Sequence, residues 1–190
     1  MKIHSLSKFA LSSAIVLVFI GVAYTYFYIP PKQVSLDDNL FIDFYKPARD
    51  RQNIIDIFYR NLDWLTTNKN YSPEFMLDTK SPNEYDTRYF GKFHIKVLRQ
   101  GNNFLGFVGY YMKNFYEGTV LFLSIHEDFR GKHYGELLLK DAIAELKKQG
   151  ASVVTLLTWL HNKRSRALYE RVGFVETSRD DKIIYYSYQP

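Results

Sequence analysis

Residues 119–158 read TVLFLSIHEDFRGKHYGELLLKDAIAELKKQGASVVTLLT, and this stretch decides the fold. Thr119–His126 and Val153–Thr158 are rich in apolar and β-branched residues, which favours buried strands. Between them, Tyr134–Gln149 repeats apolar residues at helical spacing and ends before a glycine. A strand, a loop, a helix and a second strand in this order predict a crossover between two parallel strands.

The sequence on both sides of this stretch alternates between strand and helix patterns. Short turn sequences at 101–103 and 114–118 join apolar runs and predict antiparallel hairpins. The prediction is a mixed α/β (α+β) fold, with a mostly antiparallel sheet flanked by helices and one parallel crossover. The further expected strands are 40–45, 92–98, 104–112, 174–177 and 183–188, and the further expected helices are one after Pro47 with apolar residues repeating up to Leu65, a short one at 74–77 and one at 162–172.

The composition excludes several classes of protein. The 190 residues contain no cysteine, so disulfide frameworks, thiol nucleophiles and cysteine-bound metal centres are excluded. The 25 Lys and Arg against 20 Asp and Glu give a formal net charge of +5, but both signs are mixed along the chain and do not predict a nucleic-acid partner. Aromatic residues make up 17%, and most lie in apolar strand and helix patterns, where core packing is their default role.

The N-terminal segment is predicted to span a membrane. Phe9–Ile29 holds 21 residues without a charge, about 31 Å of helix at about 1.5 Å per residue, which matches the thickness of a bilayer core. We interpret it as one transmembrane helix that follows a positively charged leader (1–8) and precedes a linker (30–40) and a single domain (41–190). A cleaved signal sequence and a buried core helix are the alternatives.

The loop inside the opening stretch is a candidate anion site. Phe129–Gly135 contains two glycines and two cations directly before a predicted helix. The N-terminus of a helix offers free backbone N–H groups and the positive end of the helix dipole, which suit a phosphate or pyrophosphate. The segment matches neither the Walker A pattern nor the GxGxxG dinucleotide pattern. A tight turn with solvated basic side chains is the alternative.

Two motifs in the same order and at a fitting separation resemble one family. LSIHEDFRGKHYG at 123–135, followed after a helix and a strand by NKRSRALYERVGF at 162–174, resembles the GNAT superfamily of acyl-CoA N-acyltransferases. In element order the resemblance covers residues 41–190. It implies acetyl-CoA as the cosubstrate, direct transfer of the acetyl group in a ternary complex to a primary amine of a small molecule or a protein, and no metal.

By this resemblance, a group of residues contacts the cosubstrate. The family's phosphate loop, Q/R-x-x-G-x-G/A, has its ends at Arg130 and Gly135. His133 stands where a glycine is usual, and it is expected to need a backbone angle less comfortable for histidine. Asn162 opens the second motif near the pantetheine arm, and an ordinary helix N-cap is its alternative role. The full set of expected contacts is Leu123, Ser124, Ile125, Arg130, Gly131, Lys132, His133, Tyr134, Gly135 and Asn162.

The same resemblance implies two catalytic residues. Tyr169 matches the tyrosine beside the thioester sulfur, a general acid for the departing thiolate, and core packing is its alternative role. Glu117 lies 13 positions before Arg130, the spacing of the base glutamate in histone-acetyltransferase-type members, and a solvated turn residue is its alternative role. Further polar candidates are His126 and Glu127, while the orientation of His161, toward the site or toward water, stays open.

The acceptor is predicted from charge. In residues 61–90, where the family holds its acceptor, five acidic residues outnumber three basic ones, and such a rim would attract a cationic amine. A solvated loop of mixed charge is the alternative. The competing function is a non-catalytic acyl-CoA sensor of the same fold, tethered to the membrane. Nucleic-acid binding is not expected.

The flanking charges and the cosubstrate disagree about the side of the membrane. Lys2 and Lys8 precede the apolar segment, and the positive-inside rule then places the following domain outside. Acyl-CoA, in contrast, is expected on the cytoplasmic side. We therefore predict a single-pass membrane protein whose domain faces the cytoplasm, and the outward orientation is the alternative.

Overall fold

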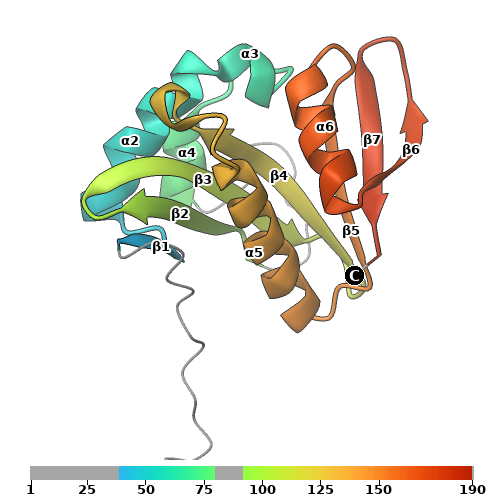
Figure 1. Ribbon diagram of the computed structural model, residues 1–190, viewed down its shortest axis with the longest axis horizontal. Helices are drawn as coiled ribbons and strands as arrows, with labels where there is room; N and C mark the ends of the chain where they lie inside the picture. Colours follow the sequence, from blue (N-terminus) through green and yellow to red (C-terminus); the bar gives the residue numbers. More distant parts are fainter. Residues whose placement is uncertain (1–38, 80–91, 190) are drawn as a thin grey trace, which may run out of the picture. The chain divides into compact units, whose positions relative to one another are not determined.

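The computed structural model describes residues 39–79 and 92–189, all of which lie in the second of two units of the chain, 1–34 and 35–190. Within these residues the predicted succession of strands and helices is confirmed (Figure 1). In order, the elements are β1 (Leu40–Phe44), α2 (Pro47–Arg60), α3 (Leu62–Leu65), α4 (Pro73–Thr79), β2 (His94–Gln100), β3 (Asn103–Met112), β4 (Glu117–Ile125), the 3-10 turn η1 (Glu127–Phe129), α5 (Tyr134–Lys148), β5 (Val153–Trp159), α6 (Lys163–Val172), β6 (Val175–Arg179) and β7 (Ile183–Tyr188).

The strands form one seven-stranded sheet in the order β1-β2-β3-β4-β5-β7-β6. Every neighbouring pair is antiparallel except β4 and β5, which are parallel and are joined through α5. The mostly antiparallel sheet with one parallel crossover is therefore confirmed for the described residues.

The parallel pair separates soon after it forms. Only Glu117–Thr119 of β4 pairs with Val153–Thr155 of β5. The register between β3 and β4 shifts at the next residues, so that Leu121 is left without a partner in β3, as in a β-bulge. Beyond this point the carboxyl ends of β4 and β5 diverge, as Figure 1 shows between the yellow and orange strands. The divergence leaves backbone groups at the centre of the sheet without a neighbouring strand.

Each face of the sheet carries its own core. On one face, Leu138 and Leu146 of α5 and Tyr169 of α6 pack with apolar residues of the strands. On the other face, Ile54 and Phe58 of α2 pack with Met76 of α4 and with phenylalanines of β3 and β4. Since apolar side chains of a strand alternate between the two faces, both cores draw on the same central strands.

One expected helix is interrupted. The apolar repeat that follows Pro47 continues to Leu65, yet α2 ends at Arg60 and α3 begins at Leu62. At the break, the side chain of buried Asn61 donates a hydrogen bond to the carbonyl oxygen of Ile57 at 2.7 Å. A side chain that bonds its own backbone competes with the helical ladder. The break redirects α3, which contacts both β4 and β5.

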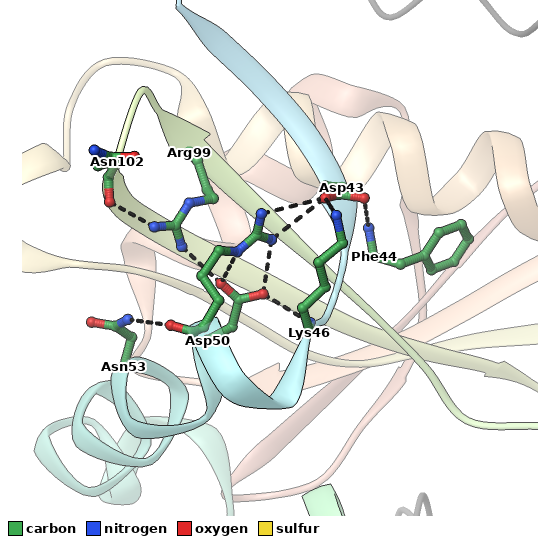
Figure 2. Close-up of polar contacts among 8 residues, drawn as sticks. Asp43, Phe44, Lys46, Asp50, Asn53, Arg99 and Asn102 are labelled. Carbon is green, nitrogen blue, oxygen red and sulfur yellow. Dashed lines mark hydrogen bonds and ion pairs between the residues drawn. The ribbon is translucent and has the colours of Figure 1, made fainter.

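A buried ionic network fastens α2 to the sheet (Figure 2). The carboxylate of Asp50, which is 0% exposed, accepts hydrogen bonds from Arg99 of β2 at 2.7 Å and from the Nε of Arg49 at 2.8 Å. It also accepts the backbone N–H of Lys46 at 2.9 Å, and so caps the first turn of α2. Arg99 in turn donates to the carbonyl oxygen of Asn102 at 2.6 Å. The network is satisfied within the protein.

The predicted membrane segment lies outside the described residues. In residues 39–79 and 92–189, no helix combines the length and the apolarity that crossing a membrane requires. The leader (1–8), the anchor Phe9–Ile29 and most of the linker (30–40) precede this part of the chain. Those boundaries stay predictions.

Candidate active site

A cavity of about 690 Å³ opens where β4 and β5 diverge. Its walls come from the ends of these strands, from α3, from the loop before α5, and from α6. Of the residues predicted for the site, all but Glu117 and Lys132 line this one cavity, namely Leu123, Ser124, Ile125, Arg130, Gly131, His133, Tyr134, Gly135, Asn162 and Tyr169. The two sequence motifs therefore meet in space.

The loop before α5 presents a row of backbone donors. Within the described residues, the N–H groups of 131–135 donate no hydrogen bond. Gly131 has φ +81° and His133 has φ 61°, the only positive φ of a non-glycine residue in this part of the chain. These left-handed angles curl the loop around the start of α5, where the N–H groups and the helix dipole favour an anion. The uncomfortable backbone angle expected for His133 is present.

The side chain of Arg130 points away from this loop. Its Nε donates to the carbonyl oxygen of Ile125 at 3.0 Å, and its Nη2 donates to the side-chain oxygen of Asn61 at 2.6 Å. The guanidinium thus joins the loop to the end of β4 and to the break between α2 and α3. Lys132 does not line the cavity; its ammonium lies 5.9 Å from the ring centre of Phe129. In this structure Arg130 positions the loop.

At the end of β4, backbone groups point into the gap between β4 and β5. His126 donates its N–H to the carbonyl oxygen of Leu105 in β3 at 2.8 Å. Because successive backbone groups of a strand point in opposite directions, the N–H groups of Leu123 and Ile125 point away from β3, toward the cavity. This open edge is what an extended amide-bearing ligand needs in order to pair with a strand.

Tyr169 lies in the wall of the cavity and in the core at once. It is 8% exposed, and its ring contacts those of Phe174 and Tyr186. Burial raises the pKa of its hydroxyl to about 12, against a hydrogen bond with Ser165 that lowers this pKa. The phenol therefore stays protonated at neutral pH and is a hydrogen-bond donor.

Asn162 begins α6 as its N-cap. Its side-chain oxygen accepts the backbone N–H of Ser165 at 3.2 Å. The residue also lines the cavity, so the predicted position and the alternative N-cap role are both present in one side chain.

Glu117 is not part of this cavity. It lies at the other end of β4, where Lys113 at 2.9 Å and Thr155 at 3.0 Å bind its carboxylate. A strand rises about 3.3 Å per residue, so the six residues from Glu117 to Leu123 amount to about 20 Å. The structure thus does not bring the predicted base to the cavity. Most of the residues between Glu117 and Arg130 belong to the extended strand β4, which separates the two ends in space.

The other two polar candidates are engaged beside the cavity. Arg60 at the end of α2 donates to the carboxylate of Glu127 at 2.9 Å and contacts the ring of His126 at 3.2 Å. Neither Glu127 nor His126 lines the cavity. Both act as polar groups at the end of the strand.

Glu136 was not anticipated from the sequence. It lies in the first turn of α5, lines the cavity and binds Lys140 at 2.7 Å and Arg171 of α6 at 3.0 Å. The hydrogen bonds from Lys140 and then Arg171 lower the pKa of its carboxyl from the ordinary value of 4.5 to about 2. A carboxylate in the first turn of a helix was visible in the sequence, but its partner on another helix was not.

Two tryptophans and a histidine occupy the rim of the cavity next to α3. The ring of His161 lies 5.3 Å from that of Trp64 in α3 and 5.7 Å from that of Trp159 in β5. All three residues line the cavity. His161 thus lines the cavity and is exposed to water as well, so both predicted surroundings are present. Sequence reasoning missed both tryptophans because only the tertiary fold joins α3 to the end of β5.

In the described parts of the chain, no three or more histidine, aspartate or glutamate side chains come together to hold a metal ion. The prediction of a metal-free reaction stays a prediction.

Comparison with known families gives one match. The model of the family described as "Acetyltransferase (GNAT) family" matches residues 57–174. No curated protein matches the chain.

Solved structures share the fold at low identity. Spermidine N-acetyltransferase from Vibrio cholerae, in complex with CoA and spermine, has a TM-score of 0.64 at 15% identity, over 80% of this chain and 96% of the other. The ribosomal-protein-S18-alanine N-acetyltransferase from Escherichia coli has 0.59 at 19%, over 79% and 93%. An N-acetyltransferase from Thermoplasma acidophilum, in complex with coenzyme A, has 0.61 at 16%, over 80% and 99%. At these identities the likeness shows the fold alone.

Proposed function

The chain belongs to the acetyltransferase (GNAT) family, since the family model matches residues 57–174 of its 190 residues, and from this membership we propose that it is an N-acyltransferase that uses acetyl-CoA. The acetyl group passes directly to the amine of an acceptor in a ternary complex. The neutral amine nitrogen forms a bond to the acetyl carbon, the carbon–sulfur bond breaks, CoA leaves as the thiolate, and the nitrogen releases to water the proton that the amide product no longer carries.

One observation carries this proposal. The free N–H groups of Gly131 and of 133–135, and the open edge of β4 at Leu123 and Ile125, belong to residues that line the same cavity. The first fits a diphosphate and the second fits the amides of a pantetheine arm. Acetyl-CoA has both groups and supplies the activated thioester. Solved proteins of this fold that hold CoA support the assignment.

The protons of the reaction call for two side chains. The Tyr169 hydroxyl, with a pKa of about 12, donates a hydrogen bond to the sulfur as its charge develops. Complete transfer of its proton is unfavourable, because an ordinary thiol has a pKa of only about 8.5. On the acceptor side, we assign the imidazole of His161, which lines the cavity beside Trp64 and Trp159, to receive the proton of the ammonium.

The absence of cysteine makes the test simple. A thiol reagent reports the release of CoA without a signal from the protein, since the chain has no thiol of its own. With the full chain and a panel of primary amines, we expect acetyl-CoA to raise the melting temperature and at least one amine to release CoA. No shift and no release would contradict the proposal.

Tyr169→Phe tests the hydrogen bond to sulfur. Removal of one donor that acts in the transition state is expected to lower kcat about 100-fold, with unchanged affinity for acetyl-CoA. The matched control is Tyr186→Phe, since Tyr186 is buried beside Tyr169 but does not line the cavity. Equal losses in both variants would reduce Tyr169 to a packing residue.

A sensor that binds acyl-CoA without turnover is the second candidate. The left-handed His133 in the loop and the position of Glu117 outside the cavity favour it. A rise in melting temperature with acetyl-CoA, without release of CoA in the presence of any amine, would support the sensor and exclude the transferase.

We also propose that Phe9–Ile29 anchors the protein in a membrane with its domain toward the cytoplasm. Its 21 uncharged residues support the anchor. Leu17→Arg places a charge near the middle of the segment, which opposes insertion by about 3 kcal/mol. We expect the parent chain in the membrane fraction, partial release of the variant, and protease access to the domain from the cytoplasmic side. A parent chain in the soluble fraction would refute the anchor.

A further inference from the structure

The half of the cavity next to α3 is mainly apolar, with Thr66 and Thr67 as polar residues of its wall. Its wall is built from three strands and one short helix, with His161 as its one histidine among the described residues. The apolar side chains of this wall are Trp64, Leu65, Leu121, Leu157, Trp159 and Ile183. An apolar wall of this extent on a surface cavity marks a binding site.

The direction of these side chains follows from strand alternation. Leu156 of β5 packs in the core on the side of α5 and α6, so its neighbour Leu157 and then Trp159 face the opposite side, toward α3. In the register of β5 and β7, Trp159 pairs with Ile183, and Leu157 pairs with Tyr185. Leu157 is 51% exposed and Tyr185 is 39% exposed, so the apolar wall continues from the cavity onto the open face of the sheet.

Of the five carboxylates of the predicted acidic rim, Glu84 and Asp86 lie outside the described residues, and the described ones do not form a rim. Of the carboxylates expected there, Asp63 lies 3.6 Å from Lys69, Glu74 accepts from Tyr59 at 2.9 Å, and Asp78 pairs with Arg51 at 3.0 Å. None of these carboxylates lines the cavity, whose one described carboxylate, Glu136, lies at the α5 end and is engaged by two cations. A polycation such as a polyamine would find no partner for its remote charges among the described residues of this wall.

We propose that the acceptor is a primary amine attached to an aromatic or branched aliphatic group. This inference rests on the proposed acetyltransferase function and adds the chemical class of its substrate. The apolar group of the acceptor packs on Trp64, Trp159 and Leu157, and this contact brings the amine beside the imidazole of His161. Aromatic side chains contribute large apolar contacts with defined ring geometry, so the wall selects for shape as well as for apolarity.

The two tryptophans of the sequence provide the measurement. Both of them, Trp64 and Trp159, belong to this wall, so intrinsic tryptophan fluorescence of the full chain reports its occupancy without any chemistry. Phenethylamine and isoamylamine are the apolar probes, and spermidine and agmatine are the cationic ones. In the presence of CoA, we expect the apolar amines to change the fluorescence at concentrations about tenfold lower than the cationic amines do.

Turnover supplies the second readout. We expect kcat/KM for the apolar amines to exceed that for the cationic amines about tenfold. Trp64→Ala is expected to raise KM for the apolar amines about tenfold and to leave acetyl-CoA affinity unchanged, while Trp64→Phe restores most of the loss. The control is Tyr116→Ala, an exposed aromatic residue of the β3–β4 turn outside the cavity, for which KM stays at the parent value.

The outcomes separate this inference from the proposed function. Fluorescence change and turnover with apolar amines, both weakened in Trp64→Ala, support it. Highest activity with spermidine or agmatine would overturn it and leave the acetyltransferase standing. Binding of acetyl-CoA without binding of any apolar amine would also overturn it. Absence of acetyl-CoA binding would instead overturn the proposed function on which it rests.

Discussion

The carboxylate of Asp50 and the backbone N–H groups of 131–135 differ in whether the protein itself satisfies their hydrogen bonds. Asp50 is completely buried, and each of its oxygens accepts hydrogen bonds from groups of the protein itself, as Figure 2 shows. The N–H groups of 131–135 find no partner in the described chain, and all of these residues except Lys132 line a cavity instead. Both regions lie at the start of a helix, α2 and α5 respectively.

This difference distinguishes a helix start that stabilises the fold from a helix start that is open to a ligand. A helix N-terminus has N–H groups that its own ladder cannot satisfy. At α2 the carboxylate of Asp50 takes that role, so the site is closed to other anions. At α5 no side chain in the described part of the chain caps the helix, and the N-cap residue His133 adopts a left-handed angle. The second helix start is left open for a ligand. We therefore expect substitutions in the first region to change stability and those in the second to change binding.

The largest expected effect is on the Asp50 network. Asp50→Ala leaves the buried guanidinium of Arg99 without its main partner, and loss of one partner of a buried ion pair costs about 3–5 kcal/mol in the free energy of unfolding. Urea denaturation of the full chain measures it, with Asp56→Ala, an exposed aspartate of the same helix, as the control. The affinity of the folded variant for acetyl-CoA should match the parent. A loss of affinity in the folded variant would erase the contrast between the regions.

A matched pair of glycines tests the loop. Gly131→Ala places a side chain at φ +81°, where open space surrounds the new methyl group but the backbone angle is unfavourable. We expect acetyl-CoA to bind about tenfold more weakly, because the row of N–H groups shifts. Gly101→Ala, at φ +56° and also in open space, imposes similar strain in the β2–β3 turn. Calorimetric titration should show weakened binding for the first variant only; equal affinities would contradict the role of the loop.

The pH dependence of stability tests the ionic contacts of Glu136, at the start of α5. Because its folded-state pKa of about 2 lies below the ordinary 4.5, its carboxylate stabilises the fold above pH 4.5, and this contribution is lost as the pH falls from 4.5 toward 2. Glu136→Gln should therefore be less stable than the parent at pH 7, by less than about 1 kcal/mol, and the gap should close near pH 2. Melting temperatures over this range measure it. A gap that widens in acid would show that the pairing with Lys140 and Arg171 is not the cause.

The smallest expected effect is at His133. His133→Gly removes the cost of a left-handed angle, about 1 kcal/mol in the free energy of unfolding. Part of this gain is offset, because glycine loses more backbone entropy on folding than histidine does. We expect a slightly higher melting temperature and acetyl-CoA affinity higher by about threefold or less, because more of the loop backbone becomes accessible. If affinity falls instead, the imidazole itself holds the ligand, and the loop does not bind through backbone groups alone.

The sequence was sufficient for most of the fold because its periodicities are strong. The apolar, β-branched run in Thr119–His126 and the helical repeat of Tyr134–Gln149 identify β4 and α5 with boundaries close to those observed. The break at Asn61 was not predictable, since periodicity does not register a side chain that bonds its own backbone. Nor did the sequence reveal where β4 and β5 separate, which depends on the bulge at Leu121.

The residues of the candidate site were predictable where they lie close together in the sequence. Arg130, His133 and Gly135 belong to one loop, and a local motif is enough to find them. Trp64 and Trp159 come together only through the fold, and neither lies in a motif. Glu117 lies at the start of β4, outside this cavity, because a spacing counted along the chain does not say at which end of a strand a residue lies.

The central claim, that the open helix start at α5 binds the diphosphate of acetyl-CoA through its backbone, has a direct test. Amide ¹H–¹⁵N spectra of the full chain, recorded during titration with acetyl-CoA, resolve each N–H group. We predict that the amides of 131–135 shift and become protected from exchange, while the amide of Lys46, already bound to Asp50, stays in place. Binding of acetyl-CoA that leaves the amides of 131–135 unchanged would contradict the account.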